Sequence, residues 1–285
     1  MKSLQVGVVT KYGLKQAPRA WNKRIDAFLK QIGFLKCTSE HGVYVKCKNK
    51  AESLIVCLYV DDLLITCSNS DQIATFKQQM KSGFEMTDLG ESAYFLGIEF
   101  KRTKLGIVMH QSKYITDVLK RFHMADCNIS HTPAEANSVN SQIEEEKPVD
   151  KTLFRQMIGT LRYICNTRPD IAYGVGVASR FMENPLQSHL VAVKRVLRYL
   201  RGTLGLGLGI MFPSKQNINC KLDLLGFSDA YWCGDKSDRK STTGYLFKLG
   251  EAPISWCYKK QDVVALSSCE SEYMLLLCVN DKQLG

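Results

Sequence analysis

The pattern of hydrophobic and polar positions predicts a helix as the first clear element of the chain, followed by a set of short strands. Apolar residues recur at helical spacing across 17–34, and Gly33 can end such a helix. Three strand-like apolar runs follow, at 42–48, 53–60 and 63–67. Turn-prone and acidic residues separate these runs, which is typical of a meander of adjacent strands.

The same pattern continues with a second helix and a hairpin. A helix is predicted from about Asp71, with Ser70 as its N-cap. The runs 93–102 and 106–111 flank a turn and predict a β-hairpin, and Ser112 opens a further helix.

The second half of the chain begins after a polar stretch. Residues 131–150 lack hydrophobic periodicity and predict a linker. Three helical segments follow, and the last of them, 186–203, carries an apolar stripe. From about Cys220 the sequence predicts short strands and then a helix over 266–279. The expected fold class is α+β or α/β.

Composition narrows the class of protein. A chain of 285 residues with 45% hydrophobic content is long enough for about two domains. Its net charge of +10 favours an anionic partner, commonly nucleic acid, although excess lysine also serves solubility. The 11 cysteines include no Cys-x-x-Cys pair, which favours a reduced intracellular compartment, cytoplasm or nucleus. No secretory signal or membrane span is predicted.

Two adjacent acids, Asp61 and Asp62, separate two of the apolar runs. A two-residue hairpin favours Asn-Gly or Asp-Gly, because its turn needs positive φ angles, so Asp-Asp is a poor structural choice. One interpretation is a metal site, since Mg²⁺ binds carboxylate oxygens together with substrate phosphates. That chemistry requires at least one further carboxylate. The alternative is an acidic loop without chemistry, and the pair alone does not decide between them.

Two helices carry basic residues apart from their apolar stripes. The predicted helix 17–34 has Arg19, Lys23 and Arg24, and the predicted helix 186–203 has Lys194, Arg198 and Arg201. These side chains are candidate phosphate contacts. The alternative is that each set is an ordinary solvated face.

Three motifs in order carry a resemblance to a known family. "YGLKQAPRAW" at 12–21, "YVDD" at 59–62 and "FLGIEF" at 95–100 resemble the reverse transcriptases of copia-type LTR retrotransposons. The segments 157–185 and 193–203 resemble the connection of the same family, and 226–274 resembles the start of its ribonuclease H domain.

The resemblance implies a division of the chain into four parts. Residues 1–125 would be a partial reverse transcriptase palm, an antiparallel sheet with helices, together with the primer-contacting hairpin. A linker at 126–150, a helical connection at 151–205 and a truncated ribonuclease H-like domain at 206–285 would follow.

The resemblance also implies roles for particular residues. Asp61 and Asp62 would be metal-binding acids of the polymerase, and Asp229 and Glu272 those of the ribonuclease H, with Mg²⁺ or Mn²⁺ as the cofactor. Glu270 and Asp223 rank lower as alternatives, and Trp21 is expected to be a core residue. The residues that would contact nucleic acid are Lys15, Gln16, Arg19, Leu96, Gly97, Lys194, Arg198 and Arg201, although Gly97 could instead serve a strand bulge.

Complete members of this family carry a further polymerase aspartate before "YGLKQAPRAW" and a third ribonuclease H acid beyond Glu272. The resemblance therefore implies a fragment with part of each ligand set, whose partners would be an RNA template, a DNA primer and the RNA/DNA hybrid. Three alternatives stay open: a nucleic-acid-binding remnant without catalysis, a captured interaction protein, and an inert pseudogene product.

Overall fold

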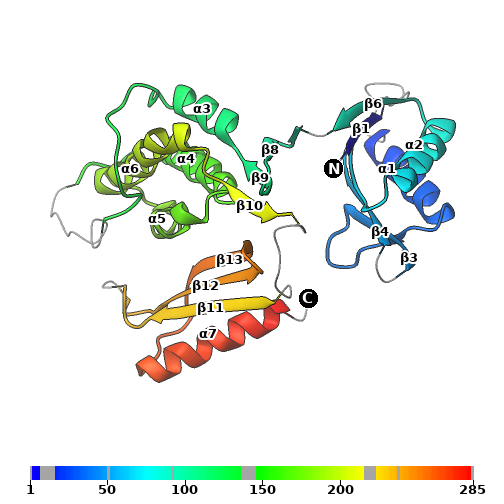
Figure 1. Ribbon diagram of the computed structural model, residues 1–285. Coiled ribbons are helices and arrows are strands. Elements are labelled where there is room, and N and C mark those ends of the chain that lie inside the picture. The colour runs from blue at the N-terminus through cyan, green and yellow to red at the C-terminus, as the bar shows by residue number, and fades with distance from the viewer. Residues whose placement is uncertain are drawn as a thin grey trace. The chain divides into compact units, whose positions relative to one another are not determined.

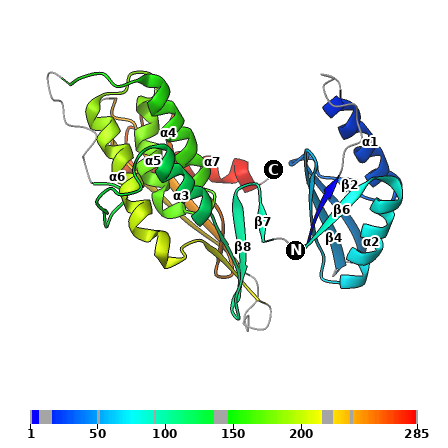
Figure 2. The same ribbon diagram turned by 90° about the horizontal axis from the view of Figure 1, so that it is seen from above.

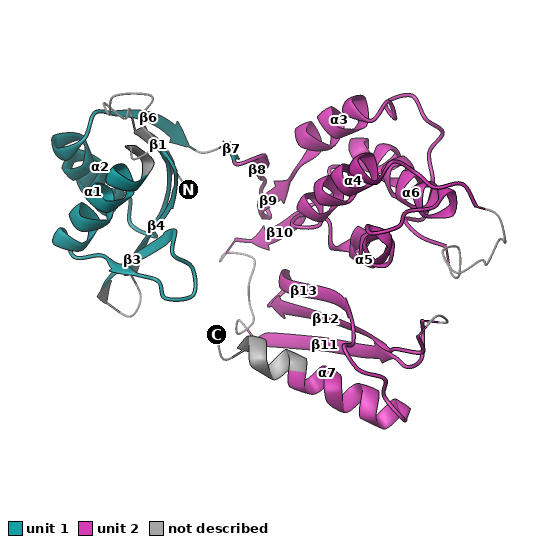
Figure 3. Cartoon of the chain, turned by 180° about the vertical axis from the view of Figure 1, so that it is seen from behind, with its two compact units in different colours: residues 1–95 teal, residues 96–285 magenta. Residues whose placement is uncertain are grey.

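The chain forms two compact units, residues 1–95 and residues 96–285 (Figure 3). The computed structural model describes residues 2–6, 17–49, 52–91, 93–135, 146–214, 223–235 and 238–283.

Unit 1 is a six-stranded antiparallel sheet with two helices. Its elements are β1 (Lys2–Val6), α1 (Ala17–Gln31), β2 (Leu35–Lys36), β3 (Val43–Asn49), β4 (Glu52–Tyr59), β5 (Asp62–Thr66), α2 (Ser70–Gly83), β6 (Met86–Glu91) and the short β7 (Tyr94–Phe95). The strand order is β2-β3-β4-β5-β1-β6. Helices α1 and α2 lie on one side of this sheet (Figure 2).

One face of the central strands forms the core of unit 1. Val56 lies opposite Ile65 in the β4–β5 register, and both are fully buried together with Leu63 beneath the helices. The alternate residues Cys57 and Leu64 point to the other face and are only half-buried. Because neighbouring residues of a strand point to opposite faces, these apolar runs are fully buried on one side only.

The ends of the helices follow from local chemistry. Gly33 has φ +93 just after α1, a conformation that glycine adopts without a steric penalty, as expected for a helix end. The N-cap of α2 is Asn69, whose side chain accepts a hydrogen bond from the amide of Asp71. The sequence prediction of Ser70 was wrong by one residue, and asparagine is as good an N-cap as serine.

Unit 2 contains helices and two further sheets. Its helices and strands are β8 (Ile98–Arg102), β9 (Gly106–His110), α3 (Ser112–Arg121), α4 (Lys151–Ile164), α5 (Ala172–Ala178), α6 (Gln187–Thr203), β10 (Ile210–Pro213), β11 (Leu224–Tyr231), β12 (Thr242–Leu249), β13 (Ala252–Lys260) and α7 (Ser268–Gln283). Short 3₁₀ turns lie at Pro169–Ile171, Ser179–Phe181 and Leu204–Leu206.

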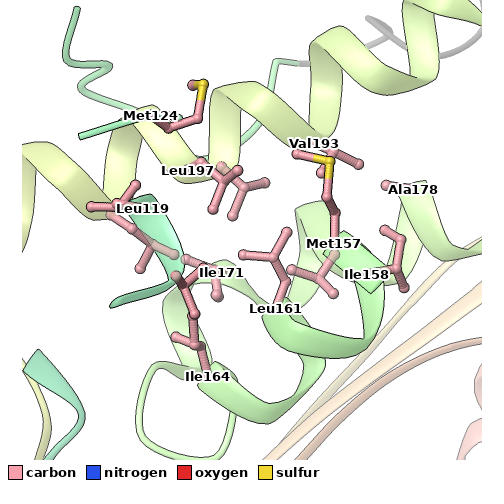
Figure 4. Packing of buried hydrophobic residues seen from close by; sticks show 14 of the residues in the cluster. Leu119, Met124, Met157, Ile158, Leu161, Ile164, Ile171, Ala178, Val193 and Leu197 are labelled. Atoms are coloured by element: carbon pink, nitrogen blue, oxygen red, sulfur yellow. The ribbon is translucent and has the colours of Figure 1, made fainter. Parts of the chain in front are cut away.

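Helices α3, α4, α5 and α6 share one hydrophobic core (Figure 4). The apolar stripe predicted for the last of them is confirmed, because Leu190, Val193, Leu197 and Leu200 are all buried. Strands β8 and β9 form the predicted hairpin, and β10 pairs with the edge of β9 that faces away from β8.

The last sheet has the strand order β11-β12-β13, and α7 lies along one of its faces (Figure 1). Leu275 of α7 is fully buried and packs with Tyr245, Ala230 and Phe247. Strand β11 is therefore an edge strand in the described part of the chain. The division of the chain at residues 125, 150 and 205 stays a prediction, and residues 136–145 of the expected linker lie outside the described residues.

In the part of the chain that the structure describes, no helix has both the length and the apolar character needed to cross a membrane.

The buried Arg168 and the partly exposed Asp170 form an ion pair in the turn before α5, and both bond to the end of α6. The guanidinium of Arg168 is almost fully buried and donates two hydrogen bonds, of 2.7 and 2.9 Å, to the carboxylate of Asp170. It also donates to the Thr203 hydroxyl at 3.0 Å, and Tyr199 donates its hydroxyl to Asp170. Burial would raise the pKa of Asp170, but the hydrogen bonds and charge of Arg168 outweigh burial and hold this pKa below its ordinary value.

We predict that Asp170→Asn lowers the free energy of unfolding by about 2 kcal/mol at neutral pH. Removing one partner of a fully buried pair costs about 3–5 kcal/mol, and the partial exposure of this carboxylate reduces the effect. Because the folded-state pKa is depressed, the stabilisation is complete above the ordinary pKa of 3.8 and is lost as pH falls through the lowered value.

Urea unfolding of wild type and Asp170→Asn between neutral pH and pH 3 measures the difference in their free energies of unfolding. Asp262→Asn is the matched control, because its partner Lys259 and its own side chain are both largely exposed, and we expect almost no change there. A difference between wild type and Asp170→Asn that does not shrink with falling pH would contradict the assignment.

Candidate metal and nucleic-acid sites

The two adjacent acids lie at the tip of the β4–β5 hairpin in unit 1. Tyr59 pairs with Asp62, so that Val60 and Asp61 form a two-residue turn between the strands. The sequence suggested that both acids occupy the turn, but Asp62 is the first residue of β5. Both acidic side chains are half-buried, whereas Val60 is 60% exposed.

The turn holds a valine in an unfavourable backbone conformation. Val60 has φ 51, and Asp61 is not among the residues with positive φ. A positive φ at the first central residue alone is the pattern of a type II′ turn, which normally requires glycine there. A β-branched residue in this region is a genuine outlier and costs of order 1–3 kcal/mol.

A buried tryptophan holds this turn. The indole N–H of Trp21 on α1 donates a hydrogen bond of 2.8 Å to the carbonyl oxygen of Val60. Trp21 is 7% exposed, which confirms the prediction of a core residue. The sequence carries no signal for its second role, because the two residues are 39 positions apart.

The carboxylates of Asp61 and Asp62 have the donor chemistry that a hard divalent cation prefers. Strand β1 lies beside β5 and places Gln5 opposite Asp62, and its sequence, KSLQV, contains no acid. Within the described ranges, no group of three His, Cys, Asp or Glu residues could hold a metal ion. At a metal site on this hairpin, Asp61 and Asp62 would be two carboxylate ligands, and the described residues add no third one.

The basic residues of α1 differ in their surroundings. Arg19 and Lys23 are exposed. Arg24 instead donates to the carbonyl of Gly83 at 3.2 Å and lies over the ring of Phe84, so that it holds α1 to the end of α2. Two further candidates, Lys15 and Gln16, lie outside the described residues.

Leu96 and Gly97 form a second tight turn, which precedes β8. Leu96 has φ 51 and Gly97 has φ 81, and two consecutive positive values are the pattern of a type I′ turn rather than of a strand bulge. The hydroxyl of Tyr163 on α4 donates a hydrogen bond to the Leu96 carbonyl. A Cβ atom on Gly97 would stand 3.3 Å from the Tyr163 ring.

Two of the three basic side chains of α6 make hydrogen bonds that the sequence does not predict. Lys194 is exposed. Arg198 donates to the carbonyl oxygens of Asn128 and Ile129, and Arg201 donates to those of Ala125 and Cys127. These two arginines hold the segment after α3 against α6. Their partners are neutral, so both positive charges remain uncompensated by these bonds.

Asp229 lies on the edge strand β11, opposite Gly244. Its neighbour Ala230 packs under α7, so Asp229 points to the other face of the sheet. There it lines an open pocket of about 390 Å³ together with aromatic residues of the sheet and α5. These aromatic residues are Tyr173, Phe227, Tyr231 and Tyr258.

Glu272 of α7 reaches the open edge of β11. Its carboxylate accepts a hydrogen bond of 3.1 Å from the amide of Ala230, the residue that follows Asp229. The structure thus brings Glu272 to the end of the strand that carries Asp229. The lower-ranked Glu270 instead accepts from the amide of Leu266 at 2.6 Å, just before α7 begins.

Unit 1 is an antiparallel sheet covered on one side by two helices, an α+β fold that is compatible with a reverse transcriptase. Residues 5–136 match the family model for reverse transcriptase (RNA-dependent DNA polymerase). The chain belongs to this family, within the Pol polyproteins of copia-type retrotransposons.

Curated relatives support the assignment along almost the whole chain. The Pol polyprotein from transposon RE1 of Arabidopsis thaliana is 41% identical over 92% of this chain and 17% of that protein. The Pol polyprotein from transposon TNT 1-94 of Nicotiana tabacum is 41% identical over 92% of this chain and 20% of that protein. A transposon Ty5-1 protein of Saccharomyces cerevisiae is 32% identical over 92% of this chain and 84% of that protein.

The chain thus spans about a fifth of the length of the two plant polyproteins. No solved structure matches it.

We predict that Gly97→Ala destabilises the protein by about 1–2 kcal/mol. Alanine at positive φ is strained, and its methyl group would crowd the Tyr163 ring. Thermal or urea unfolding measures the effect.

Gly159→Ala is the matched control for this substitution. Gly159 lies within α4, and a methyl group added there would meet no neighbouring element within 4 Å. Alanine there should stabilise the helix by up to about 1 kcal/mol. Equal effects of the two substitutions would show that the Leu96–Gly97 turn does not require glycine.

Proposed function

We propose that this chain is the part of a retrotransposon reverse transcriptase that presents the metal-binding hairpin and grips the template–primer duplex. The observation that carries the proposal is the β4–β5 hairpin, whose tip exposes Val60 and carries the consecutive residues Asp61 and Asp62. Its partners would be an RNA template, a DNA primer and their hybrid, in the cytoplasm or nucleus.

Asp61 and Asp62 would hold Mg²⁺ or Mn²⁺ through their carboxylate oxygens. When bound, paired divalent ions activate an attacking oxygen and stabilise the leaving oxygen of a phosphoryl transfer. The role of this chain's own residues is to fix the two carboxylates on a rigid hairpin. The turn residues Leu96, which is exposed, and Gly97, which is half-buried, would contact the primer. Arg19 would lie near the incoming nucleotide.

Asp229 and Glu272 would be the corresponding acids of a ribonuclease H-like part. The support is their placement at one end of β11, where Glu272 already binds the amide next to Asp229. Asp229 lies on the sheet face opposite α7, so cleavage of a hybrid would need further ligands that draw both carboxylates to one phosphate.

We predict that this chain alone does not extend a DNA primer on an RNA template with Mg²⁺. Two close divalent ions need several carboxylate ligands, and the strand beside Asp62 has none. A primer-extension assay with purified protein tests this. Template-directed extension that disappears in Asp61→Asn would contradict the prediction and show that the remaining ligands come from the substrate.

Binding without turnover is the second candidate function, and the net charge of +10 favours it. Binding of a hybrid needs phosphate contacts but not a complete metal site. Arg198 and Arg201 also hold the segment after α3, so their removal would change the fold and the charge together. Lys194, which is exposed on the same helix, is the cleaner probe.

We predict that affinity for an RNA/DNA hybrid falls steeply with salt and varies little with sequence. Each phosphate contact contributes about 0.7–0.9 to the log–log slope, so Lys194→Ala should flatten the slope by about one such step. Fluorescence anisotropy across a salt series measures it.

Lys259→Ala is the control, because that side chain is exposed but pairs with Asp262 at 3.2 Å. It should leave the slope almost unchanged. An unchanged slope in folded Lys194→Ala would mean that this part of α6 is merely solvated.

A further inference from the structure

The two turns expected to contact nucleic acid have the same arrangement of a strained residue and an aromatic hydrogen-bond donor. Each places a non-glycine residue at φ 51, Val60 in one and Leu96 in the other. In each, the carbonyl oxygen of that same residue accepts a hydrogen bond from an aromatic side chain of a helix, Trp21 of α1 or Tyr163 of α4. The two turns lie in different units, so each example stands by itself.

Packing of the turn residue does not explain the conformation of the first turn. The Val60 side chain is 60% exposed, so the protein gains little from burying it. Positive φ is disfavoured for a β-branched residue. The two-residue turn closed by the Tyr59–Asp62 pair favours positive φ at its first residue, and the hydrogen bond to the Val60 carbonyl stabilises this conformation further.

The donor is well placed to act as a fixed point. Trp21 is 7% exposed, and its ring packs edge-to-face on Phe84 with centroids 5.4 Å apart. A buried indole N–H needs a hydrogen-bond partner. If the Val60 peptide rotated away, this N–H would lose its acceptor, so the core of unit 1 penalises other turn conformations.

We propose that Trp21 is a positioning residue, which selects the conformation of the Val60–Asp61 turn and thereby the direction of the Asp61 and Asp62 carboxylates. Tyr163 has the same role for the Leu96–Gly97 turn, and its ring is held edge-to-face by Tyr114 at 5.1 Å. The consequence for metal binding rests on the proposed function, whereas the effect on the turns does not.

Replacement of the turn residue by glycine provides the sharpest test, because glycine adopts positive φ without the steric penalty. In wild type, Trp21→Phe removes the donor and keeps an aromatic ring against Phe84. It should raise the hydrogen-exchange rate of the Asp62 amide, which faces Tyr59 across the turn. We expect about a fivefold increase, the effect of one typical hydrogen bond on an equilibrium.

In the Val60→Gly background, the same Trp21→Phe substitution should change the exchange of Asp62 by much less. Trp232→Phe is the matched control, because its indole donates to the carbonyl of Ala265 at 3.0 Å in unit 2. It should leave Asp62 unaffected. Equal exchange of Asp62 in wild type and Trp21→Phe, or an equal effect in the Val60→Gly background, would overturn the proposal.

The wild-type protein supplies a second measurement that does not depend on a variant that folds. With ¹⁵N-labelled tryptophan, the indole proton of Trp21 should exchange with solvent slowly. Exchange as fast as that of free indole would overturn the proposal, because no lasting bond to Val60 could then exist.

For the second turn, Tyr163→Phe should lower the urea midpoint in wild type and lower it less in Leu96→Gly. Tyr173→Phe, whose ring packs on Tyr258, is the control and should lower it equally in both backgrounds. The same loss for Tyr163→Phe in both backgrounds would overturn this half of the proposal.

Mn²⁺ separates the positioning role from the proposed metal site. Mn²⁺ added to wild type should broaden the NMR signals of Asp61 and Asp62, and Trp21→Phe should need about fivefold more Mn²⁺ for the same broadening. No broadening in wild type, with faster Asp62 exchange in Trp21→Phe, would support the turn anchor and refute the metal site. Broadening that is identical in wild type and Trp21→Phe would overturn the claim that the anchor directs the carboxylates.

Discussion

Burial of one face of β4 and β5 beneath α1 and α2 is the constraint on which the candidate polymerase site depends. A shift of one residue in the strand register would carry Val56, Leu63 and Ile65 to the solvent face. The register therefore cannot slip, and the hairpin must reverse at Val60 and Asp61. The position of the two acids is thus fixed by apolar packing several residues away, and the carboxylates themselves do not contribute to it.

Much of this architecture could be predicted from the sequence, because periodicity reports burial directly. The helix around Trp21 and the apolar stripe of α6 show a helical repeat and lie where it places them. The location of the hairpin turn was wrong by one residue, since a valine at positive φ breaks the rule that turn prediction uses. The partners of Arg198 lie about 70 positions away in the sequence, and no local pattern predicts such a contact.

The sheet of β11, β12 and β13 shows what a sequence motif leaves undetermined. The strand and helix that carry Asp229 and Glu272 form as expected, but the direction of each carboxylate depends on neighbours of the strand. In the described residues β11 has β12 on one side only, and Glu272 binds the backbone at the free edge. A carboxylate that satisfies an edge amide also discourages another strand from pairing there, so this acid serves the fold of the sheet as well as any chemistry.

The strained turn and the two adjacent acids both disfavour formation of the hairpin tip. Two adjacent carboxylates repel each other, and a valine at positive φ adds strain, so the hairpin tip by itself opposes folding. The hydrophobic face below the tip and the indole bond of Trp21 offset these costs in the protein without metal. A bound divalent cation would reduce the remaining cost, which is the repulsion between the carboxylates of Asp61 and Asp62. The core and the indole bond thus offset the strain in the backbone, whereas the charge of the two side chains would be offset only by a bound cation.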